Sequence, residues 1–360
     1  MSSQSVSTTA PVILFGYKSS PFTNKIHLAL RLKQIPYYYV QVPSMMPRPF
    51  LRSTFNLTYR KIPICTIGHD VYCDTAVILE ALEQFGPASP SLYPKDRNGR
   101  NNRALIRGFA SYWTDRPFFR VTTGLIPGAV WETSFGDDRA ELIGHRLNAA
   151  KLAKKTPQNL SSLDLHLSIL EPQFAEGGWI FATDQPSLAD IALWYQLRWG
   201  IDIAAGKGIY NLTGGRTEDD FKDVTGSVFN EKRYSHLWRW FNAFEKYVEG
   251  LPVMLKDCSE DEATRILKEY NGEKMAFLQS PASPHWDLDG QNGLVAGAKV
   301  SVVPDDTGRN NPTLGTLVAI TPEEIILNPQ ELDGSSPLVN TRIHFPRLGF
   351  VVKPLKVAKL

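Results

Sequence analysis

The stretch KIPICTIGHDVYCDTAVIL, residues 61–79, decides the fold. Residues 62–67 and 71–73 are rich in β-branched and aromatic side chains and flank a Gly-His-Asp turn, which is typical of two short strands. Apolar residues then follow helical spacing from Asp74 to about Phe85. This segment therefore predicts a strand, a turn, a second strand and a helix, in that order.

The residues upstream extend this unit to the N-terminus. Residues 12–15 and 37–42 are β-type runs, and between them Ser20-Pro21 opens a segment with apolar residues at helical spacing. Two parallel strands need such a helical crossover. We predict an α/β domain over residues 12–88 with the order β-α-β-(α)-β-β-α, preceded by a flexible N-terminus, residues 1–11.

The residues downstream change character twice. Residues 100–278 have helical patterns almost throughout, except for a glycine-rich stretch at 205–233 that we interpret as a long surface loop. After a linker rich in proline and serine, residues 286–360 hold five short β-branched runs separated by turn clusters. We predict an all-α domain followed by a small all-β domain, a barrel or sandwich that packs on the helices and supplies no catalytic group.

Composition excludes several classes of protein. The chain has 360 residues, 42% hydrophobic and 21% charged, which is typical of folded globular proteins. Its net charge of +2 argues against nucleic acid as the main partner. No apolar run reaches the roughly 20 residues of a membrane span. The cysteines Cys65, Cys73 and Cys258 lack C-x-x-C spacing, and the histidines lack zinc motifs, so we expect no metal and a reducing, cytoplasmic location.

The chain ends in Ala358-Lys359-Leu360. This tripeptide resembles the Ser-Lys-Leu peroxisomal address. A peroxisomal location is therefore an alternative to the cytoplasm.

Ser20 lies where the first strand meets the first helix. A hydroxyl at a helix N-terminus can donate a hydrogen bond to an anion such as a thiolate. Serine followed by proline is also an ordinary helix start, with serine as the N-cap. The local sequence leaves both roles open.

Two further motifs could hold a peptide-like ligand. Pro63 begins a strand, where proline fits an edge or a cis bond, so the backbone of Ile62 could pair with an extended peptide. Asp74 could cap the following helix or bind an ammonium group, and Thr75 could hold a carboxylate. We predict that the Ile62–Pro63 bond is cis.

Four motifs together resemble the glutathione transferase superfamily: SSPFTNK at 19–25, KIPI at 61–64, DTAVIL at 74–79 and PSLADIAL at 186–193. The resemblance implies a thioredoxin-like first domain that binds glutathione and an all-helical second domain that holds an electrophile. It also implies a homodimer, and a helix-capping box at Ser187 and Asp190. The tail HFPRLGF at 344–350 resembles an extra domain of some transferase-like proteins of filamentous fungi, often tied to specialised metabolism.

The resemblance implies a role for particular residues. Ser20 matches the catalytic serine of zeta-like members and the catalytic cysteine of omega-like members. Glutathione would be bound by Ser20 and by the residues that match the family's peptide site, Lys61, Ile62, Pro63, Asp74 and Thr75. The helix that borders the cleft in the family, together with the residues before Ser20, gives the candidates for the second substrate: Tyr17, Lys18, Tyr112, Trp113, Arg116 and Phe119.

We therefore expect an enzyme that activates the glutathione thiol for attack on a small electrophile. A glutathione-dependent cis-trans isomerase is the enzymatic alternative, because the same thiolate could add to a conjugated alkene and leave again. A transferase-fold binding protein without activity is the third reading.

Overall fold

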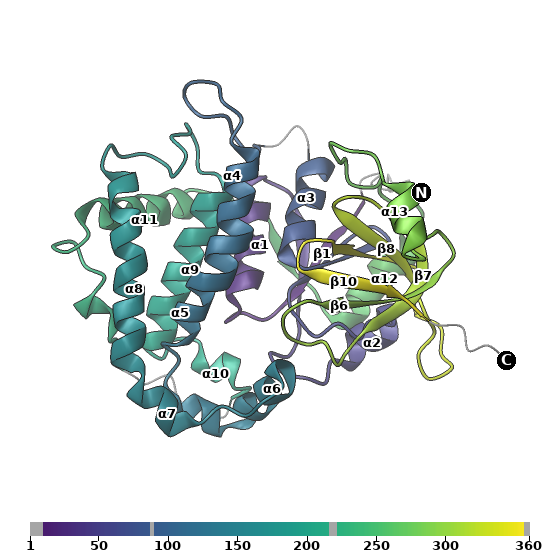
Figure 1. The fold of residues 1–360 in the computed structure, drawn as a ribbon, viewed down its shortest axis with the longest axis horizontal. Helices are drawn as coiled ribbons and strands as arrows, with labels where there is room; N and C mark the ends of the chain where they lie inside the picture. The colour runs from purple at the N-terminus through teal and green to yellow at the C-terminus, as the bar shows by residue number, and fades with distance from the viewer. Residues whose placement is uncertain (1–9, 87–89, 216–221, 356–360) are drawn as a thin grey trace, which may run out of the picture.

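The computed structural model describes residues 10–86, 90–215 and 222–355 (Figure 1). The expected peroxisomal ending at 358–360 and most of the expected flexible N-terminus lie outside these residues. None of the described helices combines the length and hydrophobicity of a membrane span.

The first domain has the predicted order. Its elements are β1 (Val12–Gly16), α1 (Pro21–Leu32), β2 (Tyr37–Gln41), α2 (Pro49–Phe55), β3 (Ile64–Ile67), β4 (Asp70–Cys73) and α3 (Thr75–Phe85). Strand β1 pairs parallel to β2 and antiparallel to β3, and β3 pairs antiparallel to β4. This is the thioredoxin-like arrangement that the sequence predicted.

The second domain is helical. Its elements are α4 (Arg103–Gly108), η1 (Phe109–Phe118), α5 (Phe119–Thr123), η2 (Gly128–Glu132), α6 (Ser134–Ile143), α7 (Ala149–Lys154), α8 (Thr156–Leu170), η3 (Glu171–Phe174), α9 (Leu188–Ala204), α10 (Ile209–Leu212), η4 (Thr225–Ser227) and α11 (Ser235–Glu249). Element η1 is a π-helix with Pro117 inside it. The predicted long loop contains α10 and η4, and α10 packs against the turn before α1.

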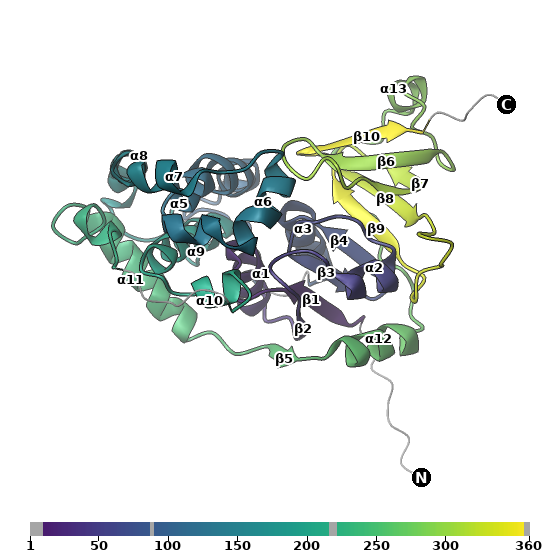
Figure 2. The same ribbon diagram turned by 90° about the horizontal axis from the view of Figure 1, so that it is seen from below.

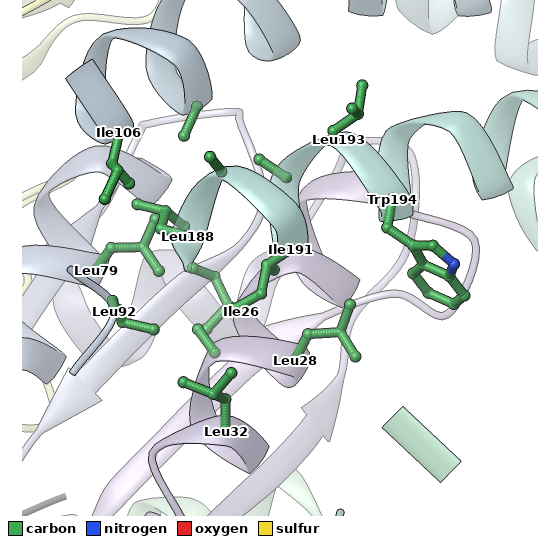
Figure 3. Close-up of a cluster of buried hydrophobic side chains, with 14 of the residues drawn as sticks. Ile26, Leu28, Leu32, Leu79, Leu92, Ile106, Leu188, Ile191, Leu193 and Trp194 are labelled. Carbon is green, nitrogen blue, oxygen red and sulfur yellow. The ribbon is translucent and has the colours of Figure 1, made fainter. Parts of the chain in front are cut away.

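The two domains share one hydrophobic core. Helix α1 buries Ile26 and Leu30 against α3 and α9, and Figure 3 shows side chains of these helices in one cluster. Helix α9 begins at the predicted capping box: Ser187 caps it, and Asp190 accepts hydrogen bonds from the Ser187 backbone N–H at 2.9 Å and from Trp240 Nε1 at 3.0 Å. The box therefore ties two helices of the core together.

The segment after α11 returns to the first domain, which corrects the predicted helical domain of 100–278. Strand β5 (Leu255–Asp257) pairs with the outer edge of β2. Helix α12 (Glu260–Glu269) buries Ala263 and Leu267 in a core cluster shared with β1 and β3. A free strand edge and an exposed apolar face of the first domain are covered in this way.

The predicted C-terminal strands are present, but they do not form a separate barrel or sandwich. They are β6 (Lys299–Pro304), β7 (Thr313–Ile320), β8 (Glu324–Pro329), β9 (Arg342–Pro346) and β10 (Phe350–Pro354), preceded by α13 (Trp286–Gln291). Strand β9 pairs parallel to β4, so the order β10-β6-β7-β8-β9-β4-β3-β1-β2-β5 is one continuous sheet. Figure 2 shows this sheet running from the first domain into the C-terminal strands.

The physical reason for this correction is the open edge of β4. An unpaired strand edge presents free N–H and C=O groups, and β9 satisfies them. Apolar side chains of β7 to β9, such as Leu317 and Ile343, also share a core cluster with Ile64 and Val71. The C-terminal strands therefore stabilise the first domain directly.

Candidate functional site

A cavity of about 450 Å³ lies where the first domain, the helical domain and the C-terminal strands meet. All three contribute to its wall: Lys61 and Asp74 from the first domain, Phe119 and Trp199 from the helices, and Phe350 from β10. The volume suits a small organic ligand. The C-terminal strands therefore contribute to the cavity wall, and the expectation that they supply no catalytic group stays a prediction.

The predicted peptide-binding residues meet in this cavity. Lys61, Ile62, Pro63, Asp74 and Thr75 all line it. The Ile62–Pro63 peptide bond is cis, as the sequence predicted. Strands β3 and β4 are antiparallel, and Ile64 at the start of β3 pairs with Cys73 at the end of β4. This pairing brings residues 61–63 close to Asp74 and Thr75.

Asp74 has an unusual backbone. Its φ is +90°, in a region that non-glycine residues seldom adopt and that is enriched at functional sites. Its carboxylate accepts the backbone N–H of Ala76 at 2.9 Å and so caps α3. Burial raises the pKa of Asp74, while the N–H of Ala76 and the charge of Lys61 oppose this shift. A cationic ligand group beside this carboxylate would relieve the cost of its burial.

The helical domain adds a carboxylate that sequence reasoning missed. Asp115 lines the cavity, its Oδ2 lies 2.7 Å from the Nζ of buried Lys25, and Thr75 Oγ1 donates to the same oxygen at 3.5 Å. The free backbone N–H groups at the start of α3 can bind an anion. The carboxylates of Asp74 and Asp115 lie beside them and can bind a cation. Such a site fits the zwitterionic head of an α-amino acid.

Ser20 lies in the wall behind the cavity surface. It is buried, and its Oγ accepts the backbone N–H of Thr23 at 3.1 Å as the N-cap of α1, whereas its neighbours Tyr17 and Pro21 line the cavity. A hydroxyl that accepts one hydrogen bond still has a proton to donate. The N-cap role is thus present, and the donor role toward a ligand stays a prediction.

The turn before α1 is held by the helical domain. Asn211 Oδ1 accepts from the backbone N–H of Ser19 at 2.9 Å and from its hydroxyl at 2.8 Å. Trp199 Nε1 donates to the carbonyl oxygen of Ser19 at 2.9 Å. These three bonds fix the position of Ser20 and Tyr17 relative to the cavity.

Of the predicted residues for a second substrate, Tyr17, Arg116 and Phe119 line the cavity. Lys18 and Tyr112 are exposed to solvent outside its lining, and Tyr112 is 67% exposed. Trp113 packs against the core and donates to His166 Nδ1 at 3.1 Å. The structure therefore brings together half of this set.

The cavity-lining side chains of this region come from the π-helix η1 and the start of α5. The hydrogen bonds of a π-helix run from i to i+5, so the chain turns less per residue than in an α-helix. The cavity is lined by Ser111, Asp115 and Phe119, a spacing of four, with Arg116 beside them. The α-helical spacing that we assumed from the sequence had placed Tyr112 and Trp113 on the cavity-lining face.

Sequence reasoning also missed an arginine cluster. The buried guanidinium of Arg48 donates to the carbonyl oxygens of Pro43, Ser44 and Arg60 at 2.8, 3.0 and 2.5 Å. Burial lowers the pKa of Arg48 to about 10. Arg60 lies 2.8 Å from Asp138 of α6. The Arg60–Asp138 pair ties the first domain to α6, and no local sequence motif predicts it.

The apolar part of the cavity comes from the helices. Trp131, Phe135 and Trp199 line it together with Phe22 and Phe119. Aromatic rings offer flat apolar surfaces to an organic ligand. In the described part of the chain, no group of three or more His, Cys, Asp or Glu side chains is arranged to hold a metal ion.

A thioredoxin-like domain and a helical domain that together enclose a cavity form the architecture found in the glutathione transferase superfamily. The comparisons agree. The family model for the glutathione S-transferase N-terminal domain matches residues 14–90, and a model described as a domain of unknown function matches residues 125–211. A glutathione S-transferase-like protein from Pseudomonas syringae is 25% identical with a TM-score of 0.63, covering 96% of this chain and all of that one. Residues 14–90 therefore match the N-terminal domain of glutathione S-transferases, and the fold of the chain is similar to that of a glutathione S-transferase-like protein.

Several plant proteins are similar to part of this chain. A probable glutathione S-transferase of Solanum tuberosum is 30% identical over 35% of this chain and 51% of its own length. Glutathione S-transferase U4 of Arabidopsis thaliana is 33% identical over 24% of this chain and 37% of its own. The chain thus spans about half the length, or less, of these relatives. The fungal resemblance of the tail, the homodimer and the cellular location stay predictions.

Proposed function

We propose that this protein is a glutathione transferase that activates the thiol of glutathione for attack on a small, largely apolar electrophile in the cavity. One observation carries the proposal: the residues expected to hold the peptide and the aromatic wall of the helical domain line the same cavity. A thiol and an electrophile held there would be adjacent, and proximity contributes much of the rate in such reactions.

Each part of the peptide would have its own partner. The γ-glutamyl head would lie at Thr75 and the α3 N-terminus, with its ammonium group toward Asp74 and Asp115. The backbone of Ile62 would pair with the cysteinyl residue by β-addition. Lys61 would face the glycyl carboxylate. Ser20 would donate a hydrogen bond to the thiolate.

The chemical gain would come from ionisation of the thiol. A thiol with a pKa of ~8.5 is only about 3% ionised at pH 7, whereas a pKa of ~6.5 makes about three-quarters of it thiolate. The thiolate would then form a carbon–sulfur bond, and the electrophile would release its leaving group or take up a proton. The aromatic residues would exclude water from this step.

Thr75→Val is expected to weaken glutathione binding about tenfold, because it removes a hydroxyl from a charged ligand group while keeping the side-chain shape. Isothermal titration calorimetry would measure the dissociation constant. Thr66→Val is the matched control, since buried Thr66 lies in β3 outside the cavity lining and its hydroxyl has no hydrogen-bond partner in the structure. Equal affinities for all three proteins would contradict the assignment of Thr75.

Mass balance separates transferase from isomerase. With a panel of conjugated and halogenated electrophiles, a transferase yields a stable adduct and consumes glutathione. Regenerated glutathione with a rearranged product would instead indicate isomerase activity. A protein that binds glutathione without either outcome would be a binding protein.

A further inference from the structure

The loop between β6 and β7 brings a carboxylate from the C-terminal strands into the cavity. Asp306 Oδ1 lies 2.5 Å from Lys61 Nζ, and both residues line the cavity. Among the described residues, Asp306 is the one acceptor within hydrogen-bonding distance of this ammonium group. Lys61 directly precedes the Ile62–Pro63 bond, so the ion pair stands at the wall where the peptide is expected.

This loop is held in place from three sides. The backbone N–H of Gly308 donates to the carbonyl oxygen of Leu142 in α6 at 2.8 Å. The N–H of Asp305 donates to the carbonyl oxygen of Gly349 at 2.9 Å, and Thr58 Oγ1 donates to the carbonyl oxygen of Pro312 at 2.7 Å. These hydrogen bonds therefore hold Asp306 in a fixed position in the cavity wall.

The charge of Asp306 bears on any anion that approaches Lys61. Burial alone would raise the pKa of Asp306, but the charge and hydrogen bond of Lys61 and the N–H of Thr307 hold it below its ordinary value. The carboxylate is thus ionised at neutral pH. A second carboxylate on the same ammonium group would meet a like charge at short range.

We propose that Asp306 is a specificity-determining residue of the peptide site, which competes with the glycyl carboxylate of glutathione for Lys61. The inference rests on the proposed function. With Asp306 in place, a free carboxylate at the glycyl end of the peptide adds little to the binding affinity. The site therefore discriminates weakly between a peptide with a free glycyl carboxylate and one in which this group is neutral. Without the negative charge of Asp306, the peptide with a free glycyl carboxylate binds more tightly than the neutral one.

The test compares two ligands and three proteins. The ligands are glutathione and glutathione with its glycyl carboxylate amidated. The proteins are the wild type, Asp306→Asn and Asp333→Asn. The last is the control: Asp333 also pairs with a cation of the first domain, Arg52, at 2.7 Å, but neither residue lines the cavity. Calorimetry at low and high salt gives the dissociation constants, and a thermal melt verifies folding.

Asp306→Asn is expected to tighten binding of glutathione about two- to fivefold, the range for a partly exposed ion pair, since the Lys61 and Asp306 side chains are 25% and 45% exposed. The amide should gain nothing, the effect should shrink at high salt, and Asp333→Asn should match the wild type. Unchanged or weaker binding of glutathione, or an equal gain for the amide, would overturn the inference alone. Failure of the wild type to bind either ligand would overturn the proposed function and this inference with it.

Discussion

His344→Leu is expected to lower the free energy of unfolding by about 3–5 kcal/mol. His344 is fully buried in β9, its Nε2 lies 2.8 Å from Asp70 of β4, and its Nδ1 lies 2.7 Å from Glu324 of β8. Both carboxylates are also fully buried. The substitution removes the group between them and leaves Arg342, whose Nε lies 2.7 Å from Asp70, as the remaining cation of the cluster. The loss arises because the buried carboxylate of Glu324 no longer has a cationic partner and that of Asp70 keeps only Arg342.

Denaturant unfolding measures this change. Asp333→Asn serves as the control, because its exposed ion pair with Arg52 is expected to contribute less than about 1 kcal/mol. A loss below 1 kcal/mol for His344→Leu would show that the cluster does not join the C-terminal strands to the first domain in the way described.

The same cluster predicts a pH dependence of stability. Both ring nitrogens of His344 face carboxylates, and only the imidazolium can donate from both. Burial alone would lower the pKa of His344, but the hydrogen bonds and charges of Asp70 and Glu324 raise it above 6.5. Because the folded state binds this proton more tightly than the unfolded state, the contribution is complete below pH 6.5 and is lost as the pH rises through the folded pKa.

Unfolding free energies between pH 6 and 10 test this dependence. The wild type should lose stability relative to His344→Leu as the pH rises. Tyr72, Lys274 and Arg342 also face the cluster, and all three are present in both proteins, so the difference between the two proteins reports on His344. A difference that stays constant over this range would mean that His344 is neutral in the folded protein.

Ser20→Ala is expected to lower turnover about ten- to a hundredfold while glutathione affinity changes little. Removing a hydrogen bond to a charged group typically costs about 1.5–3 kcal/mol, and here the loss would fall on the thiolate. The peptide would still be held at Lys61, Ile62 and Thr75. The alanine variant should also lose about 1 kcal/mol of stability, because Ser20 caps α1.

Tyr17→Phe is the matched comparison for Ser20→Ala. Tyr17 lines the cavity and Ser20 does not, so the Tyr17 hydroxyl is the alternative hydrogen-bond donor to the thiolate. Full turnover in Ser20→Ala with a large loss in Tyr17→Phe would move the catalytic role to the tyrosine.

The first domain could be predicted from sequence because its signals are local. The alternation of strand and helix patterns from Val12 to Phe85, the Pro63 strand start and the Asp74 helix start all lie within short stretches. The same motifs predicted that Lys61, Ile62, Pro63, Asp74 and Thr75 would lie together, and all five line the cavity.

The placement of the C-terminal strands and the remaining cavity residues depends on contacts between residues far apart in the chain. The register that joins β4 to β9 pairs Asp70 with Arg342, and no local pattern of either strand specifies it. The carboxylate of Asp306 reaches Lys61 across 245 residues for the same reason. Within residues 109–118 the cavity is lined by Ser111, Asp115 and Arg116, and of these the sequence pattern predicted Arg116.

The most direct test of the account is the pKa of the glutathione thiol when bound to the wild-type protein. Thiolate absorbance in the ultraviolet, recorded against pH with saturating protein, gives this value. We expect a pKa at least one unit below the ~8.5 of a free thiol, and in Ser20→Ala this pKa should rise toward the free value. A bound thiol that titrates as it does in free solution, or a protein that does not bind glutathione, would contradict it.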